Sequence, residues 1–242
     1  MKQGEFYKGK VWAEEKSRFY TTLTQYKEKN KKILEIGCGA GGGTLYLKSL
    51  LEPKEIIGVD ISKTAVEKTQ KKGIVAHTIN VSEERLPFKD EVFDLVVSFE
   101  VIEHVFDTGS FIEEIKRVLK PGGTLFISTP NLAWWANKLL LTFGYQPANT
   151  EVDLEHATIG KPKMFPQGTP AGHIHVFTKK SMKEFLKIHD IYVHKTIAIS
   201  YEHIYTSSFA KNSILRIFYA CDKILSPFFG EAFTVYIGKK RT

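Results

Sequence analysis

The sequence predicts an α/β protein with a mostly parallel sheet and helices on both faces. Short apolar runs alternate with segments of helical spacing along the first half of the chain, and this alternation is typical of strand–helix units with parallel strands. A glycine-rich stretch follows the first apolar run, where a strand would turn into a helix. The 242 residues, 43% of them hydrophobic and 25% charged, are typical of a globular domain.

Five strands and three helices are expected before residue 130. The strands are apolar runs bounded by glycine, proline or charged residues, at residues 32–36, 55–60, 74–79, 93–98 and 124–128. Helices are expected at residues 44–51 and 62–72, with Ser62 as the N-cap and Gly73 as the terminator of the second. A third begins at Ser110, which forms a capping-box pattern with Glu113, and Pro121-Gly122-Gly123 ends it.

The strand–helix alternation breaks at residues 131–171. We interpret this segment as a lid or acceptor insertion within one domain, residues 1–242, because long irregular segments in compact domains are usually functional. Its aromatic side chains would form either the core of the insertion or an apolar wall for an aromatic or prenylated acceptor. They are Trp134, Trp135, Phe143 and Tyr145.

Two helices and two strands are expected after the insertion. The helices cover residues 181–189 and 208–225, and the strands cover residues 190–200 and 232–237. The helix at 208–225 is amphipathic, and three interpretations remain open for it. It packs on the sheet, forms a dimer contact, or touches a membrane surface, and its Phe218 with the nearby Phe228 and Phe229 motivates the last.

Composition excludes several classes of protein. The two cysteines, Cys38 and Cys221, cannot build a disulfide scaffold or a four-cysteine zinc site, and reduced thiols suit a cytoplasmic protein. The first residues, Met1-Lys2-Gln3-Gly4-Glu5, lack the apolar run of a signal peptide, and no apolar run has the length of a membrane span. The net charge of +7 suits either a solvated surface or an anionic partner. We expect a monomer or a homodimer.

The glycine-rich stretch is the centre of the predicted site. Glycines at a strand-to-helix turn let a ligand approach the backbone, and the helix N-terminus offers N–H donors. Asp60 ends the second strand, where an acid accepts hydrogen bonds from ribose hydroxyls. An adenosine-containing cofactor is therefore expected at the carboxyl ends of the strands. Gly37, Gly39 and Gly42 also match the dinucleotide pattern, so an NAD-dependent oxidoreductase remains an alternative.

Three further segments carry a resemblance to a known family. Glu35 lies two residues before the first glycine, residues 86–97 lead into Glu100-Val101-Ile102-Glu103-His104-Val105, and residues 118–125 read Val-Leu-Lys-Pro-Gly-Gly-Thr-Leu. With these motifs the sequence resembles the class I S-adenosylmethionine-dependent methyltransferases, closely over residues 30–130 and more loosely to residue 242. The resemblance implies a doubly wound, Rossmann-like, seven-stranded sheet whose last strand, residues 232–237, is antiparallel and lies beside the fifth.

The resemblance also implies S-adenosylmethionine as cofactor, with S-adenosylhomocysteine as product. Glu35 would face the methionine ammonium, Asp60 the ribose hydroxyls and Ile61 the adenine. The other cofactor-binding residues would be Gly37, Cys38, Gly39 and Gly41 in the loop, Asn80 and Val81 near the adenine, and Ser98, Phe99 and Glu100 near the sulfonium. The family often has an aspartate where Asn80 stands, and an amide oxygen can still accept a hydrogen bond. Residues 1–30 form a candidate cover segment that contains Tyr7, Trp12 and Tyr20.

On the acceptor side, His104 is the candidate catalytic residue, because an imidazole is the usual general base near neutral pH. Alternatively, Glu103 and His104 only orient their loop. The motif Glu100-x-x-Glu103-His104 also resembles the metal-associated motif of ubiquinone-biosynthesis O-methyltransferases, so a divalent metal on these three residues is the alternative to a metal-free site. His156 is a candidate substrate contact from the insertion. His173 and His175 would point to opposite faces of a strand and are assigned no catalytic role.

These observations predict methyl transfer to a small-molecule acceptor, aromatic or lipid-like, at an oxygen nucleophile. A nucleic-acid (RNA) methyltransferase is the alternative that the positive charge suggests. However, Ser98-Phe99-Glu100-Val101 stands where base-amino methyltransferases carry an Asn/Asp-Pro-Pro-aromatic motif, and neither cysteine lies in a Pro-Cys motif, so no nucleic-acid partner is expected. A binding module that keeps the fold without the reaction remains open. No transmembrane segment is expected, and peripheral membrane contact is an open interpretation.

Overall fold

The computed structural model describes residues 17–26, 31–162, 170–199 and 213–241. They form a seven-stranded sheet with the order β3-β2-β1-β4-β5-β7-β6. The strands are β1 (Lys32–Ile36), β2 (Glu55–Asp60), β3 (Val75–Thr78), β4 (Phe93–Phe99), β5 (Leu119–Pro130), β6 (Ile191–Ile199) and β7 (Phe233–Lys240). β7 runs antiparallel to both of its neighbours, and the first five strands pair in parallel. The predicted Rossmann-like sheet with an antiparallel last strand is confirmed.

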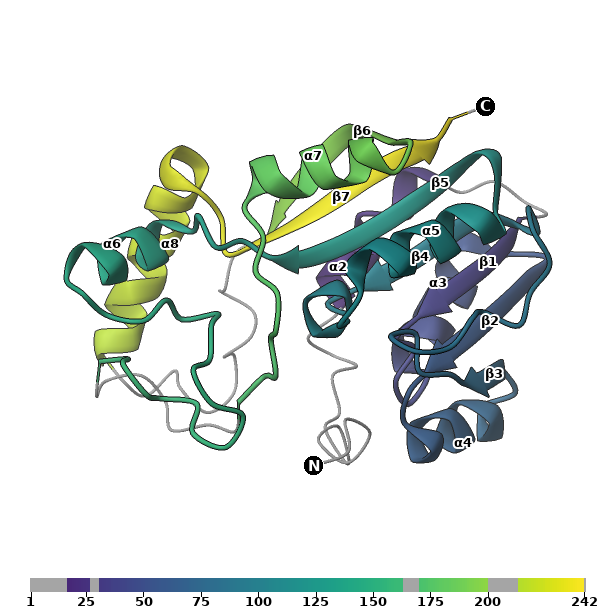
Figure 1. Cartoon of the computed structure of the whole chain (residues 1–242), viewed down its shortest axis with the longest axis horizontal. Helices are drawn as coiled ribbons and strands as arrows, with labels where there is room; N and C mark the ends of the chain where they lie inside the picture. The colour runs from purple at the N-terminus through teal and green to yellow at the C-terminus, as the bar shows by residue number, and fades with distance from the viewer. Residues whose placement is uncertain (1–16, 27–30, 163–169, 200–212, 242) are drawn as a thin grey trace.

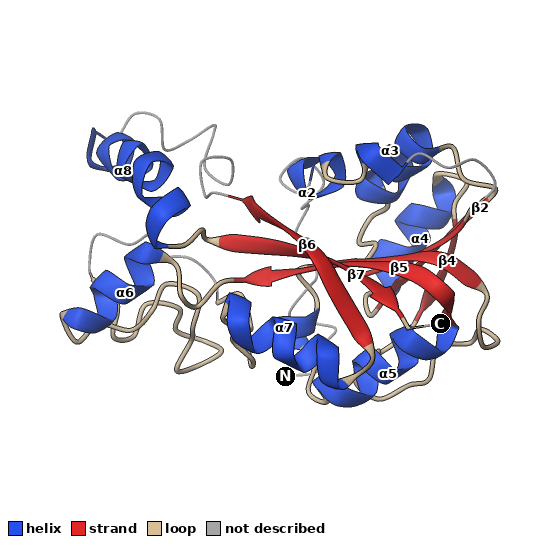
Figure 2. Ribbon diagram, turned by 90° about the horizontal axis from the view of Figure 1, so that it is seen from above, coloured by secondary structure: helices blue, strands red, loops and turns tan. Residues whose placement is uncertain are grey.

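Helices cover both faces of the sheet (Figure 2). α5 (Thr108–Val118) and α7 (Lys179–Ile188) pack on one face through a core that includes Ile115 and Leu186. α2 (Ser17–Thr21), the 3-10 turn η1 (Thr24–Tyr26) and α3 (Gly42–Leu51) pack on the other through a core that includes Leu23 and Leu47. Because both faces are covered, five of the seven residues of β4 (Phe93–Phe99) are both apolar and buried.

Two helices lie beyond the carboxyl ends of the parallel strands (Figure 1). They are α6 (Trp135–Thr142), which follows β5, and α8 (Ser213–Phe229), which precedes β7. α4 (Lys63–Lys71) contacts β2 and β3, and the 3-10 turn η2 (Ile102–His104) follows β4. None of the helices in the described part of the chain combines the length and apolar character that crossing a membrane requires.

The helix ends agree with the sequence in one case and differ in another. Ser62 caps α4 by accepting a hydrogen bond from the Ala65 N–H at 3.4 Å, as expected. The prediction that Ser110 caps the next helix is wrong, since α5 begins at Thr108 and its N-cap is Asp107, three residues before Ser110. There the Asp107 carboxylate accepts hydrogen bonds from the Ser110 N–H at 3.0 Å and from the Ser110 hydroxyl at 2.7 Å. A carboxylate is a stronger acceptor than a hydroxyl for the exposed N–H groups of a first turn.

The fifth strand is longer than residues 124–128. Leu119 already pairs with Phe93, and the pairing resumes between Thr124 and Leu95 after an irregularity in the register. The Pro121-Gly122-Gly123 segment therefore lies within β5 and is not a turn before it. It interrupts the pairing with β4 in the manner of a β-bulge, in which extra residues on one strand stay unpaired and the hydrogen-bond pairing continues beyond them.

The insertion at 131–171 is tied to the sheet at its start. The Asn131 N–H donates to the Ala232 carbonyl at 2.7 Å, and the Leu132 N–H donates to the Phe177 carbonyl at 2.8 Å. Apart from α6, its described residues are irregular. The expected helix at 208–225 is observed as α8, with residues 208–212 outside the described part. Tyr7 and Trp12 of the expected cover segment also lie outside it.

A buried aspartate joins α8 to α6. One carboxylate oxygen of Asp222 accepts hydrogen bonds from the indole N–H groups of Trp134 at 2.8 Å and Trp135 at 2.7 Å, and from the Ser226 hydroxyl at 2.7 Å. Asp222 is 1% exposed. The two tryptophans therefore belong to the core of the insertion, whereas Phe143 and Tyr145 are exposed.

We expect Asp222→Ala to lower the free energy of unfolding by about 3 kcal/mol, because two indole N–H groups and a hydroxyl lose an ionic acceptor inside the protein. Asp222→Asn keeps an acceptor oxygen and should cost about 1 kcal/mol. Urea unfolding followed by circular dichroism measures both values. Equal losses for the two variants would show that the carboxylate oxygen does not hold the two helices together.

Candidate active site

The glycine loop after β1 is held open by the carboxylate that ends β2. Gly37, Gly39 and Gly41 all have a left-handed backbone, with φ values of +79°, +55° and +78°. The Gly39 N–H donates to one Asp60 oxygen at 2.8 Å, and the Ser62 N–H donates to the other at 2.8 Å. A Cβ on Gly39 would meet no described atom within 4 Å, so the backbone of Gly39 faces open space.

Glu35 lies beneath this loop, near the end of β1. It is 2% exposed, and its carboxylate accepts a hydrogen bond from the Tyr20 hydroxyl at 2.5 Å. Burial, followed by the charge of Glu35, holds the pKa of Tyr20 well above its usual value, so the phenol stays a neutral donor. A Cβ on Gly43 would stand 1.9 Å from the Tyr20 oxygen. Glycine at that position therefore leaves room for the Tyr20 side chain.

The residues expected around the adenine lie near the carboxyl edge of β2 and β3. Ile61, Asn80 and Val81 are half-buried. The Asn80 side-chain oxygen accepts the Ser82 N–H at 3.1 Å, which leaves its second lone pair for another donor. Cys38 turns away from the open side of the loop and packs in a small cluster with Val66 and Ala76.

The expected residues at the end of β4 occupy three different environments. The Ser98 hydroxyl is buried and has no hydrogen-bond partner among the described residues. Phe99 is buried against the rings of Phe19 and Tyr20 from the N-terminal segment, at centroid distances of 5.5 and 5.3 Å. Glu100 has a left-handed φ of +55° and accepts a hydrogen bond from the Ser128 hydroxyl at 2.6 Å. Such a conformation strains a residue with a Cβ and is common at functional sites.

These features fit an adenosine cofactor with an amino-acid tail. The loop offers backbone without side chains, the Asp60 carboxylate has further lone pairs for ribose hydroxyls, and Glu35 offers a negative charge for an ammonium group. The buried hydroxyl of Ser98 gives an independent reason to expect a polar ligand group at this edge, because buried hydroxyls are usually hydrogen-bonded.

A pair of histidines lies just beyond the end of β4. His104 Nδ1 lies 3.0 Å from the Gly172 carbonyl, and His173 Nδ1 lies 2.9 Å from the Asn149 carbonyl. Because a carbonyl only accepts, each Nδ1 carries hydrogen and each Nε2 is the basic nitrogen of the neutral ring. The two rings are 4.9 Å apart between centroids. Burial lowers the pKa of His173, so its ring stays neutral near pH 7.

Glu103 anchors the segment that directly follows the insertion, and it lies close to this pair. Its backbone carbonyl accepts the N–H groups of Ile174 at 2.9 Å and His175 at 3.1 Å. Its carboxylate lies 3.8 Å from His104 Nε2. Both interpretations of Glu103 and His104 thus have a geometric basis. The backbone of Glu103 orients the segment after the insertion, and the ring of His104 presents a basic nitrogen.

The structure gathers a different metal-ligand set from the one in the sequence motif. In the described ranges, the potential ligand atoms of Glu103, His104 and His173 lie within 4.8 Å of one another. Glu100 is not part of this group and is held by Ser128. His173 therefore replaces Glu100 in the candidate set.

Two positions were not assigned from sequence, and one candidate lies apart. His173 joins His104 from a segment about 70 residues later, and only its alternation with His175 hinted at a role. Tyr20 donates a hydrogen bond to Glu35, whereas the sequence indicates for Tyr20 only a place in the candidate cover segment, residues 1–30. His156 is exposed on the insertion and pairs with Asp153, which raises the pKa of its imidazole.

Comparison with known proteins agrees with this geometry. Residues 34–127 match the family model described as "Methyltransferase domain". This match, the sheet order and the glycine loop agree with one another. Over residues 34–127 the chain is therefore similar to S-adenosylmethionine-dependent methyltransferases. This similarity favours S-adenosylmethionine over NAD as the cofactor.

Individual relatives and solved structures match the chain to different extents. A phthiotriol/phenolphthiotriol dimycocerosates methyltransferase of Mycobacterium leprae is 35% identical over 109 residues, which are 44% of this chain and 40% of that protein. The match thus spans two fifths of that relative's length. A chain in a solved complex containing the Haloferax volcanii Trm112 methyltransferase activator has 17% identity and a TM-score of 0.65, with 96% of both chains covered.

The same fold also occurs in a protein named for a different reaction. The cyclase SpnF has 15% identity and a TM-score of 0.58, with 93% of this chain and 81% of SpnF covered. At such identities the likeness shows the fold alone. The reaction has to be argued from the site.

We expect Asp60→Ala to weaken binding of S-adenosylhomocysteine at least tenfold, because the ribose hydroxyls lose a charged acceptor. Calorimetric titration measures the dissociation constant, with NAD as the ligand control. Circular dichroism of the variant checks that the loop tie to Gly39 is not required for folding. Unchanged affinity in a folded variant would remove Asp60 from the cofactor site.

We expect Tyr20→Phe to weaken S-adenosylhomocysteine binding several-fold and leave methylthioadenosine binding unchanged. The lost hydroxyl orients the Glu35 carboxylate, and only the first ligand has an ammonium group for that carboxylate. The ratio of the two dissociation constants is the readout. An equal effect on both ligands would mean that Tyr20 supports the site only through packing.

Proposed function

We propose that the chain transfers a methyl group from S-adenosylmethionine to an oxygen atom of a small, lipid-like acceptor. The observation that carries this proposal is the position of the His104–His173 pair. It links η2, directly after β4 of the cofactor edge, to the insertion that would hold the acceptor. The segment from β4 to η2 would thus contribute both to holding the cofactor and to positioning the acceptor.

The cofactor, when bound, supplies an electrophilic methyl group on a sulfonium. Glu35, Gly39 and Asp60 would hold it at the carboxyl edge of the sheet. Methyl transfer is then chiefly a matter of orientation and exclusion of water, because the sulfonium is already a good leaving group. The buried surroundings of Ser98 and Phe99 serve the second requirement.

His104 is suited to remove the proton of an acceptor hydroxyl. Its Nδ1 donates to the Gly172 carbonyl, so Nε2 is the nitrogen that accepts the proton. The Glu103 carboxylate, 3.8 Å from Nε2, would stabilise the imidazolium that results. S-adenosylmethionine held by Glu35, Gly39 and Asp60 would supply the methyl group for the acceptor oxygen, and His104 would keep the proton until it exchanges with solvent.

The insertion carries a wide, open hollow with a mixed lining. Its volume is about 440 Å³, and it is lined by the apolar Val152, Leu154 and Ile174 and by the acids Asp153 and Glu155. Ile174 directly follows His173. The M. leprae relative is named for a triol acceptor, and alcohol groups are oxygen nucleophiles. Both points favour a lipid alcohol over a nucleic acid.

An acceptor screen tests the proposal. The protein is incubated with S-adenosylmethionine that carries a labelled methyl group, with long-chain alcohols, phenols and quinols, or RNA. Label that extracts with an alcohol or quinol supports an oxygen acceptor. Label confined to RNA would overturn the proposal, as would no label in any acceptor from a protein that binds S-adenosylhomocysteine.

We expect His104→Gln to lower kcat by roughly 100-fold or more and leave the affinity for S-adenosylhomocysteine unchanged, because only proton removal is lost. His194→Gln, at an exposed position on β6, serves as the matched control and should retain full activity. A His104→Gln enzyme with normal kcat would assign this histidine to loop orientation alone.

A further inference from the structure

The C-terminal half of α8 has its polar and apolar sides reversed relative to an ordinary surface helix. Asp222 and Ser226 face inward to the tryptophans of the insertion. Ile224 and Phe228, four residues apart and so on one side of the helix, are 65% and 81% exposed. A surface helix of a globular protein normally buries its apolar side.

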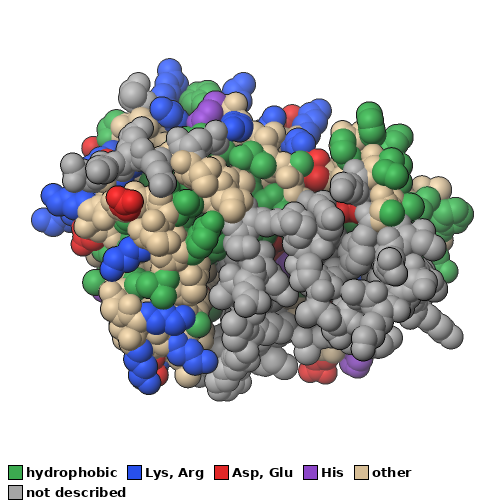
Figure 3. Space-filling view, turned by 180° about the vertical axis from the view of Figure 1, so that it is seen from behind, with side chains coloured by type: hydrophobic (Ala, Val, Ile, Leu, Met, Phe, Trp, Pro, Cys, Tyr) green, Lys and Arg blue, Asp and Glu red, His purple; other side chains and the backbone are tan. Residues whose placement is uncertain are grey.

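Other exposed apolar side chains lie at the same end of the molecule (Figure 3). Phe229 is 56% exposed at the end of α8, and Leu139 and Leu141 of α6 are more than half exposed. α6 is held at the same end, because Lys138 Nζ donates to the Phe229 carbonyl at 2.8 Å. Figure 3 shows hydrophobic side chains gathered at the upper right, where this end of the molecule lies. We call these five residues, Leu139, Leu141, Ile224, Phe228 and Phe229, the α6–α8 surface.

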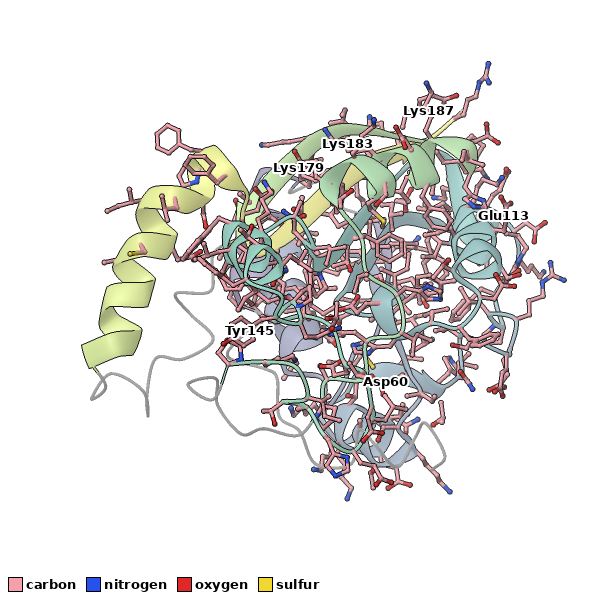
Figure 4. All side chains as sticks on the ribbon, turned by 60° about the vertical axis from the view of Figure 1, so that its left-hand side comes forward. Asp60, Glu113, Tyr145, Lys179, Lys183 and Lys187 are labelled. Carbon is pink, nitrogen blue, oxygen red and sulfur yellow. The ribbon has the colours of Figure 1, made fainter. Side chains whose placement is uncertain are left out.

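A row of lysines continues this surface along α7. The helix carries four lysines and one acid, and Lys179, Lys183 and Lys187 recur at four-residue spacing on its outer side (Figure 4). Lys179 Nζ lies 2.6 Å from Glu231, two residues after Phe229, and this ion pair joins the start of the row to the end of α8. Lys183 and Lys187 are exposed.

We propose that the α6–α8 surface and the α7 lysine row together bind the surface of an anionic lipid bilayer. Bulky apolar side chains enter the interface between headgroups and acyl chains, and lysines bind anionic headgroups. Stable attachment generally needs two such signals, and the two lie next to each other here. Two copies facing each other through this surface would bring two sets of lysines together, so the charge favours an anionic partner.

This binding is independent of the proposed methyl transfer, since it needs neither cofactor nor acceptor. It would place the carboxyl edge of the sheet close to the bilayer, because α6 and α8 lie beyond that edge. A lipid-like acceptor would then reach the insertion without crossing much water.

Vesicle flotation tests the proposal with the intact chain. Vesicles of phosphatidylcholine alone are compared with vesicles that also contain phosphatidylglycerol. We expect the protein to float with the anionic vesicles, to float less with phosphatidylcholine alone, and to dissociate partly at high salt. A protein that stays at the bottom of the gradient with both would overturn the proposal.

Two pairs of substitutions separate the apolar and electrostatic contributions. Phe228→Ser with Phe229→Ser should lower the vesicle partition coefficient at least tenfold on both kinds of vesicle. Lys183→Glu with Lys187→Glu should lower it about tenfold on anionic vesicles only. The controls are Lys68→Glu with Lys71→Glu on α4 and the exposed Val75→Ser on β3, which should bind as the parent protein does.

Circular dichroism and sedimentation complete the test. Each variant should keep the parent's spectrum and unfolding temperature, because the substituted side chains are exposed. Equal flotation of the phenylalanine variant and the parent would contradict the proposal. So would a parent dimer that the phenylalanine substitutions convert to monomer, since the surface would then bind a second copy.

Discussion

The hydrogen bonds that the Asp60 carboxylate accepts are the constraint on which the proposed site depends. They join the end of β2 to the Gly39 N–H in the loop after β1 and to the Ser62 N–H at the start of α4. The glycine loop can therefore keep its left-handed backbone and its open side at the centre of the sheet. In open α/β sheets ligands bind where the strand order reverses, and here that point lies between β1 and β4. The carboxylate thus prepares the crevice before any ligand enters it.

The acceptor side depends on contacts of a different kind. Its parts come from η2, directly after β4, and from the insertion, and they meet through the Glu103 carbonyl and the rings of His104 and His173. The strained backbone of Glu100 lies between these parts and the sheet, and Ser128 of the neighbouring strand holds it. Backbone strain persists only where the surrounding structure maintains it. The rigid sheet therefore positions a loop whose own sequence would not adopt this conformation.

The sequence predicted the central strands, the glycine loop and Asp60 because their signals are local and agree with one another. It placed the start of α5 incorrectly because Asp107 and Ser110 are both good caps, and only the structure shows which side chain accepts the free N–H groups. The extension of β5 through Pro121 depends on pairing with Phe93, which no local turn signal reveals. His173 was not assigned for the same reason, since its partner ring lies about 70 residues away in the chain. Contacts distant in sequence thus account for most of what could not be predicted.

The position of β7 has a consequence for how the protein is made. β6 pairs with β7 alone within the described sheet, and β7 is the later of the two to leave the ribosome. At roughly 5–20 residues per second of synthesis, several seconds pass between the appearance of Ile199 and that of Phe233. During that interval β5 and β6 both expose unpaired backbone edges, which invite pairing with other chains. A nascent chain of this topology would therefore gain more from a chaperone late in translation than early.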